Sequence, residues 1–286
     1  MSTMQNSKKF KAYSKVLSIA GSDSGGGAGI QADLKTFHEF KCYGASVITA
    51  VTSQNTMGVF NIHEIPQSSI ESQLDCVLRD IDFDSIKIGM LFSNEIIKIV
   101  AKKLIEYKCK NIVLDPVILS KNKTQLLKND AYKTLINNLF PLTEILTPNL
   151  PEAEILLSRN IQSLYDIEKA AIDLLSLGPQ AVVVKGGHFS NGNKCSDCMA
   201  ISSENKVTVF WLESEKFFTN NSHGTGCTFS AAFAANLAIG LNRVESFKEA
   251  KKFISKSILQ GSYYKIGHGI GPICHFGITT KIRKTI

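Results

Sequence analysis

The chain of 286 residues contains no apolar run that approaches the roughly 18 to 20 residues needed to cross a bilayer. Its start, MSTMQNSKKFKAYSK, is polar and basic and lacks the apolar segment of a secretory signal. No internal repeat, low-complexity tract or long linker interrupts the sequence. We therefore expect a cytoplasmic protein with one folded domain and no membrane partner.

Cysteine is too sparse for a disulfide scaffold. The 7 cysteines are an odd number scattered along the chain, so reduced thiols are expected. Cys195 and Cys198 have C-x-x-C spacing but lack a second pair, or histidines at ligand spacing, so neither zinc nor redox chemistry is expected. We place this pair in a surface loop that precedes a hairpin.

Basic residues exceed acidic ones, giving a net charge of +7, but the excess lies mostly in a leading run at 8–15 and a closing tail at 281–284. No basic strand with interleaved aromatic residues and no recognition helix stands out, so no nucleic-acid partner is expected. The predicted domain spans residues 15–276. A basic extension at 1–14, expected to be disordered, precedes it, and a basic tail at 277–286 follows it.

Short β-branched runs alternate with longer helical patterns, which predicts βα units around a mostly parallel sheet. The composition, 44% hydrophobic and 20% charged, is that of an ordinary globular protein. Strands are expected at 15–21, 47–53, 85–90, 111–117, 144–149 and 181–187. Helices are expected at 94–107, 225–239 and 246–262, and a hairpin at 198–203 and 206–212.

Polar and glycine-rich motifs come directly after the predicted strands. Ligands of open parallel sheets bind at the carboxyl ends of the strands. Each motif alone is compatible with an ordinary turn, but their common position predicts a cleft at one rim. The motifs are Gly21–Gly27, Gln54-Asn55, Gly89-Met90, Asp115-Pro116, Pro148-Asn149 and Lys185–Gly187.

The segment NSHGTGC, which ends at Cys227, precedes a helix of small residues, TFSAAFAANLAIG. Its glycines allow close backbone approach, and the free N–H groups and positive dipole of a helix start bind phosphate oxygens. A plain helix entry capped by Ser222 or Thr225 is the alternative. A thiol at a helix amino terminus has its pKa lowered from about 8.5 toward neutrality. Beside a phosphate donor, Cys227 would then accept the proton of an attacking hydroxyl.

At this point the sequence resembles a known family. The segments AGSDSGGGAGIQADLKTF, SVITAVTSQNT, KIGML, NIVLDPV, TPNLPEAE, VVVKGGH, HGTGC and GHGIGPICHF, taken in order, are similar to bacterial hydroxymethylpyrimidine/phosphomethylpyrimidine kinases of the ribokinase-like superfamily. The resemblance runs from about Lys15 to Phe276. It implies a three-layer αβα fold with a mostly parallel central sheet, a homodimer, and two successive ATP-dependent phosphorylations in thiamin biosynthesis.

The resemblance also implies roles for individual residues. It makes Cys227 the catalytic base, and the amides of Gly224, Thr225, Gly226 and Cys227 the groups that hold the transferring phosphoryl group. An aminopyrimidine suits the implied ring contacts, because a carboxylate and an amide carbonyl accept from its amino group and an amide N–H donates to a ring nitrogen. These implied contacts are Gly21, Asp33, Gln54, Met90 and Val117.

The donor side follows the same resemblance. Lys185 would neutralise the ATP phosphates, and Asn149 and Asp115 would accompany it. Glu152 completes an Asn-x-x-Glu element that organises Mg²⁺ through water, with Asp115 sharing that task. Such a set aligns and neutralises the reactants, which is what phosphoryl transfer requires. A need for potassium stays open.

Two further sequence features limit this assignment. The glycine run at 25–27 is not a P-loop, because no Gly-Lys-Ser/Thr follows it, and we interpret it as a tight turn beside the pyrimidine. Some family members carry lysine where this chain has His268. A phosphate role for His268 and a rim position without catalytic duty are both left open.

Three alternatives are retained. Pyridoxal kinase has the same fold and acts on a planar nitrogen ring with a hydroxymethyl group, and Met90 and Gln54 favour the pyrimidine without excluding it. A non-catalytic pyrimidine sensor would keep the pocket, although intact Asp115, Glu152, Lys185 and Cys227 argue against one. A nucleic-acid-binding protein would show strongly salt-dependent retention of DNA or RNA.

Overall fold

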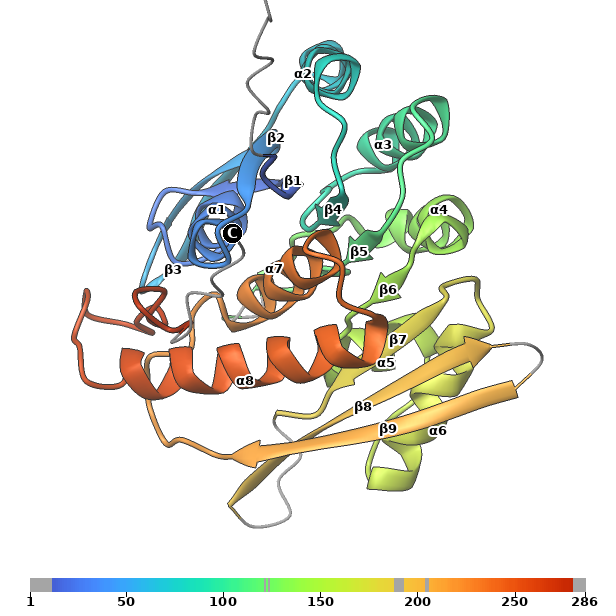
Figure 1. The fold of residues 1–286 in the computed structure, drawn as a ribbon. Helices are drawn as coiled ribbons and strands as arrows, with labels where there is room; N and C mark the ends of the chain where they lie inside the picture. The colour runs from blue at the N-terminus through green and yellow to red at the C-terminus, as the bar shows by residue number, and fades with distance from the viewer. Residues whose placement is uncertain (1–11, 121, 123, 188–192, 204–205, 280–286) are drawn as a thin grey trace, which may run out of the picture.

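The apolar runs form the centre of a nine-stranded sheet in the computed structural model, which describes residues 12–120, 122, 124–187, 193–203 and 206–279 (Figure 1). The strand order is β3-β2-β1-β4-β5-β6-β7-β8-β9. The strands from β2 to β7 in this order are parallel, while β3, β8 and β9 join antiparallel. The bounds are β1 (Lys15–Asp23), β2 (Tyr43–Asn55), β3 (Gly58–Glu64), β4 (Ser85–Ile88), β5 (Ile112–Leu114), β6 (Ile145–Leu146), β7 (Ala181–Lys185), β8 (Lys194–Ser203) and β9 (Lys206–Glu215).

Helices cover both faces of the sheet and produce the three layers (Figure 1). One face carries α1 (Gly29–Glu39), α7 (Thr225–Ala238) and α8 (Arg243–Gly261). The other carries α2 (Gln67–Asp80), α3 (Asn94–Glu106), α4 (Tyr132–Leu139), α5 (Leu150–Leu157) and α6 (Leu164–Leu175), with two 3-10 turns at Asn129–Ala131 and Phe140–Leu142.

Successive side chains along each central strand point to opposite faces of the sheet, and this alternation forms the two cores. In β5, Ile112 and Leu114 pack under the α2–α6 layer, whereas Val113 packs under α1, α7 and α8. Because parallel strands are covered on both faces, every position of this strand is buried. The α/β prediction with a mostly parallel sheet is confirmed.

Several expected boundaries shift for physical reasons. The strand expected at 111–117 ends at Leu114, just before Asp115-Pro116, because proline has no N–H to donate to the ladder. The last helix begins earlier than predicted, at Arg243, since the Asn242 side chain accepts from the Glu245 N–H and caps it.

The loop predicted for Cys195 and Cys198 is wrong. Both residues lie within β8, where Cys198 pairs with Val184 on one side and Trp211 on the other and is fully buried. All 7 cysteines are free thiols. The strand starts at Lys194 because its backbone pairs along the whole length of β9.

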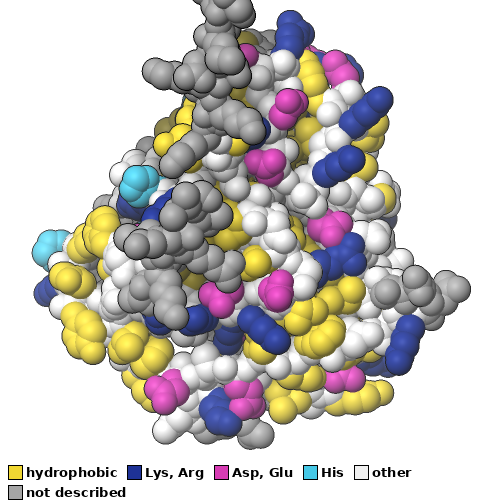
Figure 2. Space-filling view, viewed as in Figure 1, with side chains coloured by type: hydrophobic (Ala, Val, Ile, Leu, Met, Phe, Trp, Pro, Cys, Tyr) yellow, Lys and Arg dark blue, Asp and Glu magenta, His cyan; other side chains and the backbone are white. Residues whose placement is uncertain are grey.

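The two chain ends lie partly outside the described residues. Of the extension predicted at 1–14, the structure describes only 12–14. At the other end, Ile278 is buried and Thr279 bonds Glu39, so packing continues past the predicted boundary at 276. In the part of the chain that the structure describes, no helix is long and apolar enough to span a bilayer. Figure 2 shows cationic and acidic side chains intermixed on one face of the molecule.

Candidate active site

The donor-side residues meet at the rim where the parallel strands end. Lys185, the last residue of β7, forms an ion pair with Asp115, which directly follows β5; Nζ lies 2.8 Å from Oδ1. Asn149 forms a parallel bridge with Lys185, so the ends of β6 and β7 are held together. A Cβ on Gly226 would lie 3.4 Å from that Nζ and 3.6 Å from Asp115 Oδ2. The first turn of α7 therefore sits directly over the ion pair.

The start of α7 requires glycine. Gly224 is the N-cap residue with φ +83°, and a Cβ there would collide with the carbonyl oxygen of Gly27. The amides of the first helical turn have no intrahelical acceptor, which leaves them available to an anion. The segment before α7 and the glycine turn after β1 are thus packed backbone against backbone.

Cys227 occupies this same first turn, but its protonation differs from the expectation. Burial raises the pKa of the Cys227 thiol to about 11, although Lys87 and the Gly29 amide oppose that rise. The negative charges of Asp33 and Asp115 reinforce it. The predicted lowering of this pKa is therefore wrong, because desolvation outweighs a helix dipole of roughly half a charge.

Asp33 is paired with Lys87 beneath the rim residues. Its side chain is fully buried, with Oδ2 accepting from Lys87 Nζ at 2.9 Å and from Ser18 Oγ at 2.6 Å. Burial raises the pKa of Asp33, and the charge of Lys87 only partly offsets that rise. Burial would lower the pKa of Lys87, but the charge of Asp33 outweighs burial and the pKa of Lys87 is raised overall. The Oδ1 atom of Asp33 has no partner among the described residues, and the contact with the pyrimidine stays a prediction. The lysine within the otherwise apolar strand segment SIKI was the sequence feature that could have indicated this buried ion pair.

The apolar ring contacts do come together. Met90 packs with Ala50, and Val117 borders the same small cluster. A Cβ on Gly21 would lie 3.0 Å from the Met90 sulfur, so glycine lets the backbone pass close to that side chain. Gly21 and Val117 thus both lie near Met90, and their contact with a ring stays a prediction.

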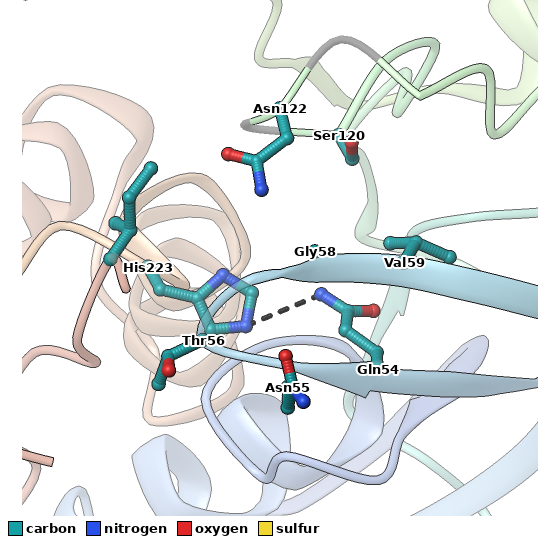
Figure 3. Close-up of a pocket in the computed structure, with 9 residues that line it drawn as sticks. Gln54, Asn55, Thr56, Gly58, Val59, Ser120, Asn122 and His223 are labelled. Atoms are coloured by element: carbon teal, nitrogen blue, oxygen red, sulfur yellow. Dashed lines mark hydrogen bonds between the residues drawn. The ribbon is translucent and has the colours of Figure 1, made fainter. Parts of the chain in front are cut away.

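Gln54 points into a hollow shared with His223 (Figure 3). Its Oε1 lies 3.0 Å from Thr52 Oγ1, and its Nε2 lies 3.4 Å from His223 Nε2. The hollow holds only about 20 Å³, space for a water molecule, but a wider one of about 320 Å³ adjoins it at Thr56, Asn122 and Ile270. His268 lines this second hollow and is exposed.

Two residues of the site were missed from the sequence. Asp23 Oδ2 lies 2.8 Å from His223 Nε2 and also accepts from the amides of Gly27 and Ala28. Burial alone would raise the pKa of Asp23, but His223 and these backbone donors lower it overall. An aspartate at the start of a glycine turn can be recognised from the local sequence. Its pairing with His223, 200 residues away, cannot.

Glu152 is held by its own helix start. It forms a capping box with Asn149, in which Glu152 Oε2 accepts from the Asn149 N–H at 2.8 Å and Asn149 Oδ1 accepts from the Glu152 N–H at 2.9 Å. Burial raises the pKa of Glu152 to about 7, with Lys185 opposing and Asp115 reinforcing the rise. This carboxyl group is therefore poised to lose its proton when a cation approaches.

The acidic groups suit a magnesium ion bound largely through water. Among the described residues, no group of three or more His, Cys, Asp or Glu side chains could hold a metal ion. Asp115 and Glu152 supply two hard oxygen donors, and Mg²⁺ commonly takes one or two carboxylates and completes its shell with water and phosphate oxygens. The residues present fit such an ion.

The fold and this rim define a small-molecule phosphotransferase of the ribokinase-like class. Residues 23–274 match the family model described as phosphomethylpyrimidine kinase. The chain therefore belongs to the phosphomethylpyrimidine kinase family.

Named relatives agree with this assignment. The chain is 46% identical to a hydroxymethylpyrimidine/phosphomethylpyrimidine kinase of Haemophilus influenzae over 92% of its length and 96% of the relative. It is 41% identical to the enzyme of the same name from Bacillus subtilis, over 92% and 94% of the two chains.

Solved structures of two related activities share the fold. A Bacillus subtilis pyridoxal kinase in an ADP complex superposes with a TM-score of 0.83 at 36% identity, covering 92% of this chain and 98% of that one. A Clostridium difficile phosphomethylpyrimidine kinase gives 0.73 at 40% identity, covering 85% and 99%.

Proposed function

We propose that this chain uses ATP to phosphorylate 4-amino-5-hydroxymethyl-2-methylpyrimidine, and then phosphorylates the monophosphate to the diphosphate, in thiamin biosynthesis. Family membership supports the activity. The observation that carries it is the Lys185–Asp115 ion pair beneath the first turn of α7, with Cys227 in that same turn. A cation, helix-start amides and a proton acceptor are the groups that such a phosphoryl transfer uses.

In the first step, the substrate hydroxyl oxygen bonds to the γ-phosphorus while the bond from that phosphorus to the bridging oxygen of ADP breaks. ADP leaves with the electron pair, and the hydroxyl proton passes to the Cys227 thiolate. Since burial raises the pKa of this thiol to about 11, the thiolate is a minor form, and Lys87 and the Gly29 amide are the groups that favour it.

The donor phosphates would lie against Lys185 and the Gly224–Cys227 amides. Alignment and charge neutralisation are the main requirements of this reaction, and both are supplied by groups fixed at strand and helix ends. We assign Asp115 and Glu152 to Mg²⁺, partly through water, with Asn149 holding Glu152 in place. A bound ion would shield the negative charge of the phosphates.

The ring would lie against Gly21, Met90 and Val117, with Gln54 hydrogen-bonding one edge. Asp33 would contact the ring through Oδ1, which has no partner among the described residues. Because the hollow at Gln54 holds about 20 Å³, a ring can enter only if its walls shift.

We also propose a homodimer and a cytoplasmic location. The hairpin of β2 and β3 exposes apolar side chains, among them Tyr43 in β2, Met57 in the connecting turn and Phe60 in β3, which a second copy would cover. Light scattering at several protein concentrations tests the dimer. The free thiols suit a reducing compartment.

Pyridoxal phosphorylation is the second candidate, because pyridoxal kinases superpose with TM-scores of 0.82 to 0.84. The test incubates the protein with ATP, magnesium and either the hydroxymethylpyrimidine or pyridoxal, and identifies the products by mass. Pyrimidine monophosphate followed by diphosphate supports both steps, and monophosphate alone contradicts the second. Pyridoxal phosphate alone moves the assignment to the second candidate, and the absence of any product contradicts both.

A further inference from the structure

His223 is clamped at the junction of three chain segments. Its ring Nε2 is 2.8 Å from Asp23 Oδ2, and its own N–H and carbonyl bond Gly271 and Ile273. A Cβ on Gly27 would collide with the ring, so the glycine turn lies flat against it. The side chain of His223 is 13% exposed and that of Asp23 3%. The imidazole therefore has a fixed orientation before any ligand arrives.

The contacts of the ring decide which nitrogen faces a ligand. An ionised carboxylate can only accept a hydrogen bond, so the Nε2 of His223 is protonated and donates to Asp23. Nε2 then cannot accept from the Gln54 amide nitrogen 3.4 Å away, and that amide keeps its protons for another partner. Figure 3 shows the other ring nitrogen turned toward the side of the hollow where Asn122 lies. This nitrogen is the one available to a ligand.

His223 is also the ionisable member of its hollow. The other residues that line it are neutral: Gln54, Asn55, Thr56, Gly58, Val59, Ser120, Asn122 and Ile270. Lys87 is sealed against Asp33, and Lys185 is engaged by Asp115 on the donor side. An acidic phosphate group that enters this hollow would meet the free ring nitrogen of His223, which can take up its proton.

The two acceptors of the proposed reaction differ in charge. The alcohol of the first step must lose a proton, whereas the phosphate oxygen of the second step is already negative and needs its charge balanced. For the same γ-phosphorus to be reached, the monophosphate must place its phosphate between the ring and the α7 start. His223 immediately precedes that start, at Gly224.

We propose that His223, oriented by Asp23, binds the acceptor phosphate in the second phosphorylation and is not required in the first. An acceptor oxygen attacks the γ-phosphorus, the bond to the bridging oxygen breaks, and ADP leaves with the electron pair. If the acceptor phosphate arrives as the monoanion, its proton moves to the free ring nitrogen, which then donates back to the phosphate. This inference rests on the proposed function, because it assigns one residue to one of its two steps.

The decisive variant is His223→Gln. Glutamine places an amide near the position of Nε2, so it keeps a donor to Asp23 while removing the second nitrogen, which would take up the phosphate proton. We expect kcat/KM for the monophosphate to fall about 10- to 100-fold more than kcat/KM for the alcohol, the usual range for losing a charge-assisted hydrogen bond. His63→Gln, on exposed β3, is the matched control and should change neither value.

Three results would overturn the inference: equal losses for both acceptors, no loss for either, or a selective loss in His268→Gln but not in His223→Gln. Calorimetric binding separates this inference from the proposed function. If the wild-type protein turns over neither acceptor, the proposed function fails. A monophosphate affinity weakened by His223→Gln, with alcohol affinity unchanged, would still support the phosphate site. An unchanged monophosphate affinity would refute it.

Discussion

The buried ion pair between Lys87 and Asp33 provides the sharpest prediction for Lys87→Met. Both side chains are 0% exposed and are joined at 2.9 Å. Removing the ammonium leaves Asp33 with the Ser18 hydroxyl alone, while Asp33 Oδ1 already has no partner in the described structure. Breaking a buried pair from one side typically costs about 3 to 5 kcal/mol. We expect the free energy of unfolding to fall by about that amount, out of the roughly 5 to 15 kcal/mol of a typical domain.

The matched control is the double variant Lys87→Met with Asp33→Asn. It removes both charges and keeps both shapes, so it should recover most of the lost stability, because paired buried charges can often be replaced by neutral groups at little net cost. Urea unfolding followed by circular dichroism measures both variants at equal protein concentration.

The pH dependence of the stability of Lys87→Met tests whether an unpaired Asp33 carboxylate causes the loss. Burial raises the pKa of Asp33 above its ordinary value of 3.8, and loss of Lys87 raises it further. Above about pH 4 the folded state then holds a proton that the unfolded state has released, so the stability of Lys87→Met falls as pH rises from 4 toward 7. If Lys87→Met were as stable as the double variant, or if its loss of unfolding free energy did not shrink at low pH, the unpaired Asp33 carboxylate could not be the cause.

Other predictions concern the rim. Gly224→Ala should lose more unfolding free energy than Gly240→Ala, because both have positive φ but only the first places its Cβ against Gly27; equal losses in urea titrations would show that backbone strain alone matters. Cys227→Asp should abolish the alkaline rise in the first-step rate that a base with a pKa of about 11 produces between pH 7 and 10, because a carboxylate is already deprotonated there. The same alkaline rise in both proteins would rule out Cys227 as the base. Lys185→Met should raise the KM for ATP about tenfold or more in steady-state assays, whereas Lys194→Met, which breaks an exposed pair with Glu213, should leave it unchanged. Equal KM values in these two variants would place the donor phosphates elsewhere.

Local pattern was sufficient for most of the fold. The run IVL at 112–114 is apolar at every position because a parallel strand is covered on both faces, and such runs alternate with helical patterns. The C-x-x-C segment was misplaced because strand length in a hairpin depends on the partner, and β9 pairs as far as Lys194. Pairing across a sheet is a non-local property that spacing does not encode.

The motifs at the strand ends indicated which residues meet at the rim, and Asp115, Asn149, Lys185 and Gly226 do meet. This much follows from sequence because the carboxyl ends of parallel strands share one edge. The sequence also carries the similarity that identifies the family.

Tertiary structure decided the electrostatics. Asp33 is paired with Lys87 of β4, and enclosure raises the pKa of the Cys227 thiol that a helix start would lower. Asp23 and His223 meet across 200 residues of chain. Charge interactions depend on distance and on exclusion of water, and both are set only when the layers close around the site.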